Sequence, residues 1–540
     1  MYLKMISLNK KYLTLFFLLL FLILLRTDYR FIEKPLCCGD DHDYFSHAET
    51  LVIDFDLDYS NQLAGFENNR YNNLGRIAPQ GFVGTGLLAA PFLFLGSIID
   101  NFLFRFMDFD PNKAFNYKIL LYSLSSIFYF FASIFLIHKT LYKLKIKSKI
   151  YHILLIFLGS GLPYFAFERY SMTHVYEIFT ISLLFYLSYK FYSLEETNNK
   201  IYAFLIPAVM VLSLLVRWTN YYVLLLPIIF KLLFLSKLDK SASLLKMLST
   251  YISLVLSFVA YLFMNYSIYG FVGINPNKIY GNAGSKLQYF LDSITNLPLF
   301  LKQNTLYFSR VLFSEEFGIF WFSPIIFLGG ILAILLFMNP EKPFLLKILL
   351  FLTFSQVFGT VLVWMSTASS YGYRYLYSLI PVSIFIYYSH KNNQVKKLSA
   401  YYLFYFSLIG LGGFIFFETT ELTSLREGVN SFDVLVPYTQ TEYLSGLFKS
   451  VVNYESYLKI FSTSFLGALI FKILILFVGI PKFDYYLVQA GLPAENDDFQ
   501  ALLLQINDIS IDKFIFVFLF LYYFSRKISL MSGKGYQNYE

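Results

Sequence analysis

Charged residues are scarce in this sequence. Asp, Glu, Lys and Arg together make up 14% of its 540 residues, whereas soluble domains carry roughly 25%. A water-soluble globular protein is therefore excluded, and so is a disordered chain, because disorder needs high charge and low hydrophobicity. Apolar residues fill the chain instead: 57% are hydrophobic, 21% are aromatic, and the mean hydropathy is +0.56. We expect an all-α polytopic membrane protein.

Cysteine is nearly absent as well. The only two, Cys37 and Cys38, are adjacent, so they cannot form a disulfide framework or a cysteine-rich zinc site. No Walker sequence occurs, which argues against an ATP-driven pump. The net charge of +8 comes from basic residues scattered singly between apolar runs, a pattern that indicates cytoplasmic loops rather than a nucleic-acid surface. We expect no nucleic-acid partner.

Apolar runs long enough, or nearly long enough, to cross a hydrocarbon core of about 30 Å recur along the chain. The first run, residues 13–25, follows three lysines and has no small-residue cleavage site after it, so we expect a retained signal anchor with its N-terminus inside. The predicted bundle of about 13 transmembrane helices has spans near residues 12–25, 117–138, 151–167, 173–191, 202–217, 221–236, 247–269, 317–338, 347–365, 374–389, 399–418, 457–479 and 513–526.

One further apolar run, residues 81–96, decides the sidedness of everything after it. The loop 139–149 holds five lysines and no acid, and short loops of this kind lie in the cytoplasm. The loop lies there only if the 81–96 run is a half-inserted juxtamembrane helix rather than a span, and we therefore predict a juxtamembrane helix. Because the chain changes sides at each span, the same count places the following segments on the outer face: 26–116, 168–172, 217–220, 270–316, 366–373 and 419–456.

The first outer loop contains the most acidic part of the sequence. Asp40, Asp41 and Asp43 stand beside His42 and His47. A carboxylate near a membrane surface, beside an apolar helix, has its pKa raised toward the range of a general base. The spacing of Asp41-His42-Asp43 is also one that can bind a divalent cation. The alternative is a solvated acidic loop that performs no chemistry.

A second polar cluster lies at the predicted outer mouth between two spans. Glu168 and Arg169 are followed there by His174 and Glu177. His174 and Glu177 are three residues apart, so they share one face of a helix. Ionisable groups at the end of a span normally face the bundle interior or a water-filled cavity, because exposure to lipid is costly. The alternative is that the histidine and the glutamate only satisfy each other at the interface.

Two arginines are predicted at the same outer level. Arg217 lies in the string Leu-Val-Arg-Trp-Thr-Asn, and Arg374 lies in Tyr-Gly-Tyr-Arg-Tyr. The guanidinium fork suits phosphate oxygens, and aromatic neighbours shield it from competing water. The alternative is that each arginine snorkels to the interface from an aromatic belt.

One motif is a false lead. The string from Gly84 to Ala89 fits the G-x-G-x-x-A pattern of dinucleotide-binding proteins. It lies inside an apolar run, however, without the strand and helix context that the pattern requires. We expect its glycines to allow close packing between helices.

The order of these features resembles the GT-C superfamily of glycosyltransferases, which use lipid-phosphate-linked sugars, and most of all its protein O-mannosyltransferase and aminoarabinose transferase branch. That branch carries a D-E-x-x-Y-x-x-x-A-like string after its first span. Asp40-Asp41, Tyr44 and Ala48 fall on this string, with Asp41 in the place of the glutamate. The segment from Pro79 to Gly96 is similar to the juxtamembrane helix of the branch, without its doubled proline.

The second outer loop of the branch usually carries an R-x-x-x-x-D string. Arg169 matches its arginine, whereas His174 replaces its acid, which directs attention to Glu168 as the carboxylate. The R-W-T-N string at Arg217 and the G-Y-R-Y string at Arg374 are similar to later arginine motifs of bacterial relatives. The resemblance covers residues 1–235 and is architectural beyond them.

The resemblance implies a GT-C-like bundle with three parts: a transmembrane module over residues 1–269 that includes the outer loop 26–116, an outer loop over 270–316, and a variable transmembrane module over 317–540. It implies transfer of a sugar from a polyprenyl-phosphate-sugar donor to the hydroxyl of a lipid, glycan or protein acceptor, with inversion at the anomeric carbon. The enzyme would lie among the lipids of the cytoplasmic membrane with its site facing the periplasm or exterior.

The resemblance also implies roles for particular residues. Asp40, with Asp41, is the expected base, and the one cofactor considered is a divalent cation at Asp41-His42-Asp43. Two alternatives stay open: an O-antigen polymerase or ligase that uses a lipid-diphosphate donor, and a non-enzymatic transporter of lipid-linked sugars. The expected catalytic residues are Asp40, Asp41, Glu168 and His174, and the expected substrate- or phosphate-binding residues are Arg217, Arg374, Tyr44 and Arg169.

Overall fold

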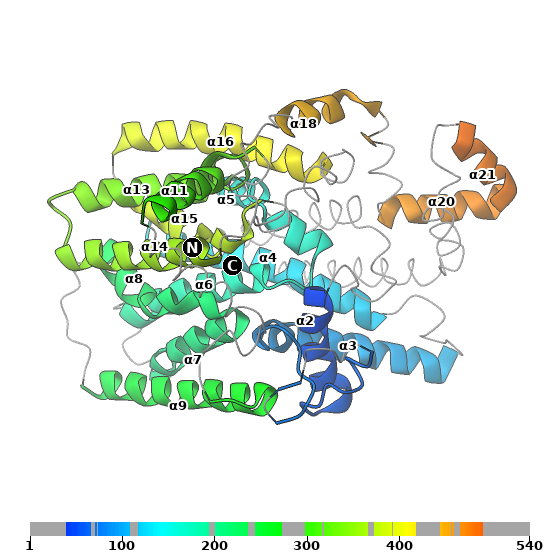
Figure 1. Ribbon diagram of the computed structural model, residues 1–540, viewed down its shortest axis with the longest axis horizontal. Coiled ribbons are helices and arrows are strands. Elements are labelled where there is room, and N and C mark those ends of the chain that lie inside the picture. Colours follow the sequence, from blue (N-terminus) through cyan, green and yellow to red (C-terminus); the bar gives the residue numbers. More distant parts are fainter. Residues whose placement is uncertain are drawn as a thin grey trace, which may run out of the picture. The chain divides into compact units, whose positions relative to one another are not determined.

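The computed structural model shows a helical protein (Figure 1). The described residues contain one isolated antiparallel bridge, between Tyr71 and Ile77, and no β-sheet. The expected all-α class is confirmed. The structure describes residues 39–65, 71–72, 74–107, 117–193, 200–235, 244–272, 297–315, 318–364, 372–390, 392–416, 443–454, 456–457 and 465–489.

The helices are labelled as in Figure 1. They are α2 (Gly39–Glu49), α3 (Gly84–Met107), α4 (Tyr117–Lys143), α5 (Ile150–Leu158), α6 (His174–Tyr192), α7 (Lys200–Val216), α8 (Leu226–Phe234), α9 (Leu244–Tyr269), α11 (Leu297–Phe313), α12 (Ile319–Phe322), α13 (Pro324–Met338), α14 (Phe344–Trp364), α15 (Leu379–Ser389), α16 (Asn393–Phe416), α18 (Tyr443–Val452), α20 (Phe465–Val478) and α21 (Ile480–Gln489). Shorter helical turns are η2 (Thr50–Asp54), η3 (Tyr164–Glu168), η5 (Trp218–Leu224) and η7 (Arg374–Leu376).

The chain divides into two units. One comprises residues 35–95 and 121–452 and holds every residue predicted for the site. The other comprises residues 1–34, 96–120 and 453–540, and it contains α20, α21, the end of α3 and the start of α4. In that unit the Asp100 carboxylate accepts hydrogen bonds from the backbone N–H groups of Tyr117 and Lys118, each at 2.9 Å. A carboxylate thus satisfies the first N–H groups of α4.

Aromatic side chains join the middle helices of the larger unit. The ring of Phe385 on α15 lies 4.2 Å from that of Phe185 on α6 and 6.2 Å from that of Phe230 on α8, between ring centroids. Helix α7 packs between α6 and α9. The first turn of α6 and the end of α7 carry residues of the site described below.

Five described helices are long and apolar enough to cross a membrane. They comprise residues 84–105, 117–143, 250–269, 344–361 and 393–416, and three shorter apolar helices comprise 201–216, 324–338 and 379–389. A multi-pass membrane protein is supported, whereas the predicted number of about 13 spans is not confirmed. The predicted spans 12–25 and 513–526 lie outside the described residues, as does most of the outer loop 270–316.

Several apolar runs that we predicted as single spans are broken in the structure. The run 151–167 divides at Gly159 into α5 and η3, and the run 317–338 divides at Ser323 into α12 and α13. The runs 221–236 and 374–389 each contain a 3-10 turn followed by a short helix, α8 or α15. A break of this kind needs no polar side chain, because neighbouring protein can satisfy the freed backbone groups. The hydropathy of the run therefore does not reveal the break.

The helix predicted over 81–96 is longer than expected. Helix α3 begins at Gly84 and continues to Met107, and its residues 84–105 are long and apolar enough to cross a membrane. The expected end at Gly96 is therefore wrong. The juxtamembrane placement now depends on the lysines of loop 139–149 alone, and it stays a prediction.

The packing role expected for the glycines of the false dinucleotide motif is confirmed. A Cβ atom on Gly84 would collide with the backbone of Leu215 and Val216 at the end of α7. A Cβ atom on Gly86 would collide with His47 and lie 2.9 Å from the backbone nitrogen of Ala48, both on α2. The two glycines therefore let α3 approach α2 and the end of α7 closely.

Candidate functional site

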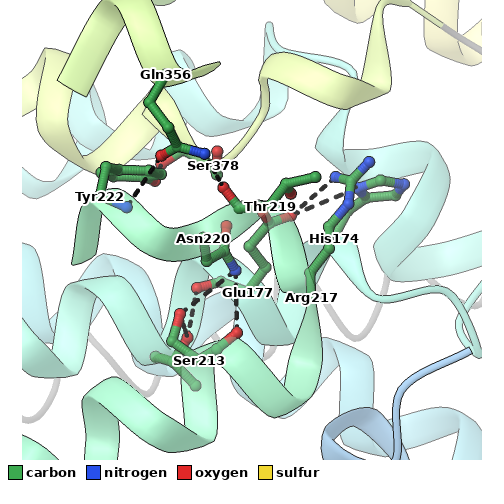
Figure 2. A network of polar contacts seen from close by, with 10 residues as sticks. His174, Glu177, Ser213, Arg217, Thr219, Asn220, Tyr222, Gln356 and Ser378 are labelled. Carbon is green, nitrogen blue, oxygen red and sulfur yellow. Dashed lines mark hydrogen bonds and ion pairs between the residues drawn. The ribbon is translucent and has the colours of Figure 1, made fainter. Parts of the chain in front are cut away.

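Arg217 lies where α7 ends. Its backbone is extended, and the 3-10 turn η5 follows it directly. The side chain is 9% exposed. Its Nη1 group donates to Oε2 of Glu177 at 3.3 Å and contacts Nδ1 of His174 at 3.4 Å (Figure 2). A guanidinium can only donate, so Nδ1 accepts and the imidazole carries its proton on Nε2.

His174 and Glu177 occupy the first turn of α6. The Nδ1 atom of His174 lies 3.7 Å from Oε2 of Glu177, which confirms that the two side chains share one face. Glu177 is fully buried and His174 nearly so. The pair does more than satisfy itself, because Arg217 contacts both members. We did not include Glu177 among the site residues, although its spacing from His174 was the available signal.

Arg374 opens the 3-10 turn η7, far from Arg217 in the sequence. The central guanidinium carbon of Arg374 lies 5.5 Å from the centroid of the Tyr375 ring, and that of Arg217 lies 5.2 Å from the same centroid. Two cations thus share one aromatic platform, an arrangement that favours each of them electrostatically. Tyr375 was missed by the sequence analysis, because one tyrosine carries little signal in a chain with 46 of them.

A buried ion pair connects the acidic loop to this region. Arg169 follows η3, and its Nε and Nη2 groups both donate to Oδ2 of Asp41 on α2, at 3.0 and 2.8 Å. Both side chains are nearly inaccessible. The positive charges of Arg217, Arg374 and Arg169 all act on His174. Arg169 binds an internal carboxylate here, and its substrate-binding role stays a prediction.

Tyr44 and His47 secure α2 to the segment before α3. The Tyr44 ring packs on Gly81, whose φ of 143° favours glycine and whose missing Cβ would lie 2.7 Å from that ring. The imidazole of His47 bonds the Tyr59 hydroxyl through Nδ1 at 2.8 Å and the Gly81 carbonyl through Nε2 at 3.2 Å. Burial lowers the pKa of His47 to about 4, and the hydrogen bond to Gly81 opposes this effect. Both residues therefore position the acidic helix.

The remaining predicted residues are less informative. Asp40 lies in α2 and Glu168 in η3, but their side chains are outside the described part of the structure. The described residues contain no group of three or more His, Cys, Asp or Glu side chains that could hold a metal ion. Asp41 and Asp43 lie on a helix, where residues two apart do not face each other. The geometry of α2 therefore does not favour the cation site predicted at Asp41-His42-Asp43.

Lysines gather at the opposite end of α6. The Nζ atom of Lys139 on α4 lies 4.9 Å from the centroid of the Tyr186 ring, and that of Lys190 lies 6.0 Å from the same ring. Lys231 on α8 lies 5.6 Å from the ring of Tyr192. Because α6 has 19 residues, about 27 Å separates its ends. Tyr186, which both Lys139 and Lys190 approach, lies about 18 Å along the helix from His174, so these lysines are well separated from the arginine site.

Comparisons with known protein families, with curated proteins and with solved structures find no match for this chain. Its function is therefore inferred from its own residues and their geometry. The central observation is that Arg217 and Arg374, on separate parts of the chain, converge on Tyr375 beside His174.

Proposed function

We propose that this chain is a membrane glycosyltransferase of the GT-C type. It moves a sugar from a polyprenyl-phosphate-sugar donor to an acceptor hydroxyl at the outer face of the membrane. The observation that carries the proposal is the convergence of Arg217 and Arg374 on the ring of Tyr375. Both contacts of Arg217 to His174 and Glu177 use Nη1. Its Nη2 and Nε groups have no hydrogen-bond acceptor among the described residues, and they point to an anion as ligand.

The proposed reaction needs little from the protein besides these charges. The acceptor oxygen attacks the anomeric carbon, the bond from that carbon to the phosphate oxygen breaks, and the lipid phosphate leaves with the electron pair. The proton of the acceptor hydroxyl passes to a carboxylate, for which we propose Asp40, while the two arginines stabilise the departing phosphate. Direct attack inverts the configuration of the sugar, because no protein nucleophile takes part.

An apolar groove that is connected to the segment of Arg374 supports an amphipathic donor. Its volume is about 450 Å³, and α11, α13 and α14 line it, with Phe308 and Phe358 among its residues. Tyr307, next to Phe308, bonds through its hydroxyl to Tyr373, the residue before Arg374. A ligand with a phosphate head and a hydrocarbon chain is the class that uses both surfaces.

The lysines at the far end of α6 support the proposed orientation. Lys139, Lys190 and Lys231 lie near this end of α6. Short basic segments lie on the cytoplasmic side, so we propose that this end faces the cytoplasm. The arginine site lies at the other end of the helix, which we propose faces the exterior. A cytoplasmic membrane with an outward-facing site is therefore the proposed location.

The decisive experiment is an assay of the purified full-length protein with a polyprenyl-phosphate-sugar. Release of polyprenyl phosphate that depends on an acceptor hydroxyl is the expected result. Consumption of only lipid-diphosphate-linked sugars would favour the polymerase or ligase alternative. Movement of an intact lipid-linked sugar across vesicles, without release of polyprenyl phosphate, would favour a transporter.

A further inference from the structure

The turn that follows Arg217 is held from a distant helix. Gln356 lies on α14, within the segment 344–361 that is long and apolar enough to cross a membrane. Its Nε2 group donates to the carbonyl oxygen of Thr219 at 2.7 Å, and its Oε1 atom accepts from the backbone N–H of Tyr222 at 2.9 Å. Figure 2 shows this side chain reaching across to η5. One carboxamide thus binds a carbonyl oxygen and an N–H group of the same turn.

The same turn is connected to the segment that carries Arg374. The buried hydroxyl of Tyr222 donates to the carbonyl oxygen of Ser378 at 2.9 Å, and Ser378 lies two residues after the end of η7 (Figure 2). On the other side, Nδ2 of Asn220 donates to the carbonyl oxygen of Ser213 on α7 at 3.1 Å. A continuous set of hydrogen bonds therefore runs from α14 through the turn of Arg217 to the turn of Arg374.

We propose that Gln356 is a positioning residue that sets the separation of the Arg217 and Arg374 guanidinium groups, and through it the affinity for a phosphate monoester. This inference rests on the proposed function, since it concerns the same two arginines. It goes further by naming a residue that touches neither arginine but holds the turn after Arg217, which Tyr222 links to the segment of Arg374. Displacement of reacting groups by a fraction of an ångström is enough to weaken a charge-assisted fork.

A carboxamide is the side chain that this position requires. The turn offers one acceptor, the Thr219 carbonyl, and one donor, the Tyr222 N–H. Gln356→Leu has a similar size but leaves both backbone groups without this partner, and a lost partner in a partly buried place is costly. Gln356→Glu keeps the acceptor for Tyr222 and places an anion against the carbonyl of Thr219 instead of a donor.

The experiment measures binding of farnesyl phosphate, a short prenyl phosphate monoester, to the purified full-length protein, with uncharged farnesol as the comparison. We expect Gln356→Leu to weaken farnesyl phosphate binding about tenfold or more, because two hydrogen bonds that fix the turn are lost. Farnesol binding should not change. Thr353→Val is the matched control, since the Thr353 hydroxyl is buried on the same helix and, among the described residues, bonds only to the carbonyl of Leu349.

A double-mutant cycle separates positioning from general destabilisation. In an Arg217→Lys background the fork is already lost, so Gln356→Leu should add little further loss of phosphate affinity. If Gln356→Leu does not fold, Gln356→Glu takes its place in both measurements. If the Gln356 variant binds farnesyl phosphate as tightly as Thr353→Val does, this inference is overturned, even if the thermal stability of the variant falls. That result would leave the proposed function untouched. A wild-type protein that does not bind farnesyl phosphate would instead contradict the proposed function and this inference with it.

Discussion

Arg217 and Arg374 lie over the same tyrosine ring, although one ends a helix in the first half of the chain and the other begins a turn in the second half. The shared ring limits the distance between the two guanidinium carbons to at most the sum of their distances from it. Arg217 also contacts Nδ1 of His174, so the two arginines, the tyrosine ring and the histidine form one connected cluster.

Replacing either arginine with lysine should impair the proposed reaction despite the retained charge. A lysine ammonium is a point charge that cannot reproduce a bidentate contact to phosphate oxygens. We expect Arg217→Lys and Arg374→Lys each to lower turnover by about 10²-fold, the scale seen when one stabilising donor is removed. The measurement is release of polyprenyl phosphate. Arg76→Lys, at an exposed arginine, should retain wild-type turnover. Equal activity in all three variants would contradict the proposed role of Arg217 and Arg374 in binding the phosphate.

Asp40 is predicted to act in the chemical step. We expect Asp40→Asn to bind farnesyl phosphate as the wild type does but to lose at least about 10²-fold in turnover, the effect of removing a general base. Binding and turnover measured on the same preparation check this expectation. A rate near that of the wild type would move the role of base to Asp41 or Glu168.

Asp41 should behave differently, because its carboxylate is held by Arg169. Asp41→Asn leaves a buried guanidinium without its anionic partner, a change that costs about 3–5 kcal/mol of unfolding free energy. Denaturant unfolding of the purified protein measures it. The exposed Asp58→Asn serves as control and should change stability by about 0.5 kcal/mol or less. A double variant with Arg169→Gln should recover part of the loss, and strict additivity would speak against the pair.

The stability of the fold should depend on pH through His47. Its pKa is about 4 in the folded chain, against 6.5 for an unperturbed histidine. Between these values the unfolded chain binds a proton that the folded chain does not, so stability falls as the pH falls from about 6.5 to about 4, by about 3 kcal/mol in all. Thermal unfolding midpoints across this range check the effect. His47→Gln should be less stable at pH 7, but its stability should not show this fall between pH 6.5 and pH 4.

The topology prediction concerns the loop 139–149. Lys145 is exposed, and we expect a cysteine placed there to be labelled only from the cytoplasmic side. Ser60→Cys, at an exposed position of the first loop, should be labelled from outside and is the matched control. Both variants need a background without Cys37 and Cys38. Labelling of position 145 by an impermeant reagent added outside intact cells would reverse the sidedness and make α3 a span.

The sequence by itself determined the helical membrane class, because hydropathy and low charge are properties of local composition. It also indicated the face shared by His174 and Glu177, since a three-residue spacing on a helix has only one geometry. The packing role of Gly84 and Gly86 was predictable for a similar reason: an apolar run with no strand beside it excludes a nucleotide loop.

Only the tertiary structure decided which of these groups meet. The pairing of Asp41 with Arg169, the contact of Arg217 with Tyr375 and the hydrogen bond of Gln356 to Thr219 each join residues from distant parts of the chain. Sequence periodicity states which face of one helix is polar, but not which other helix lies opposite it. The breaks at Gly159 and Ser323 depended on tertiary context too, because buried neighbours rather than local hydropathy satisfy the freed backbone groups.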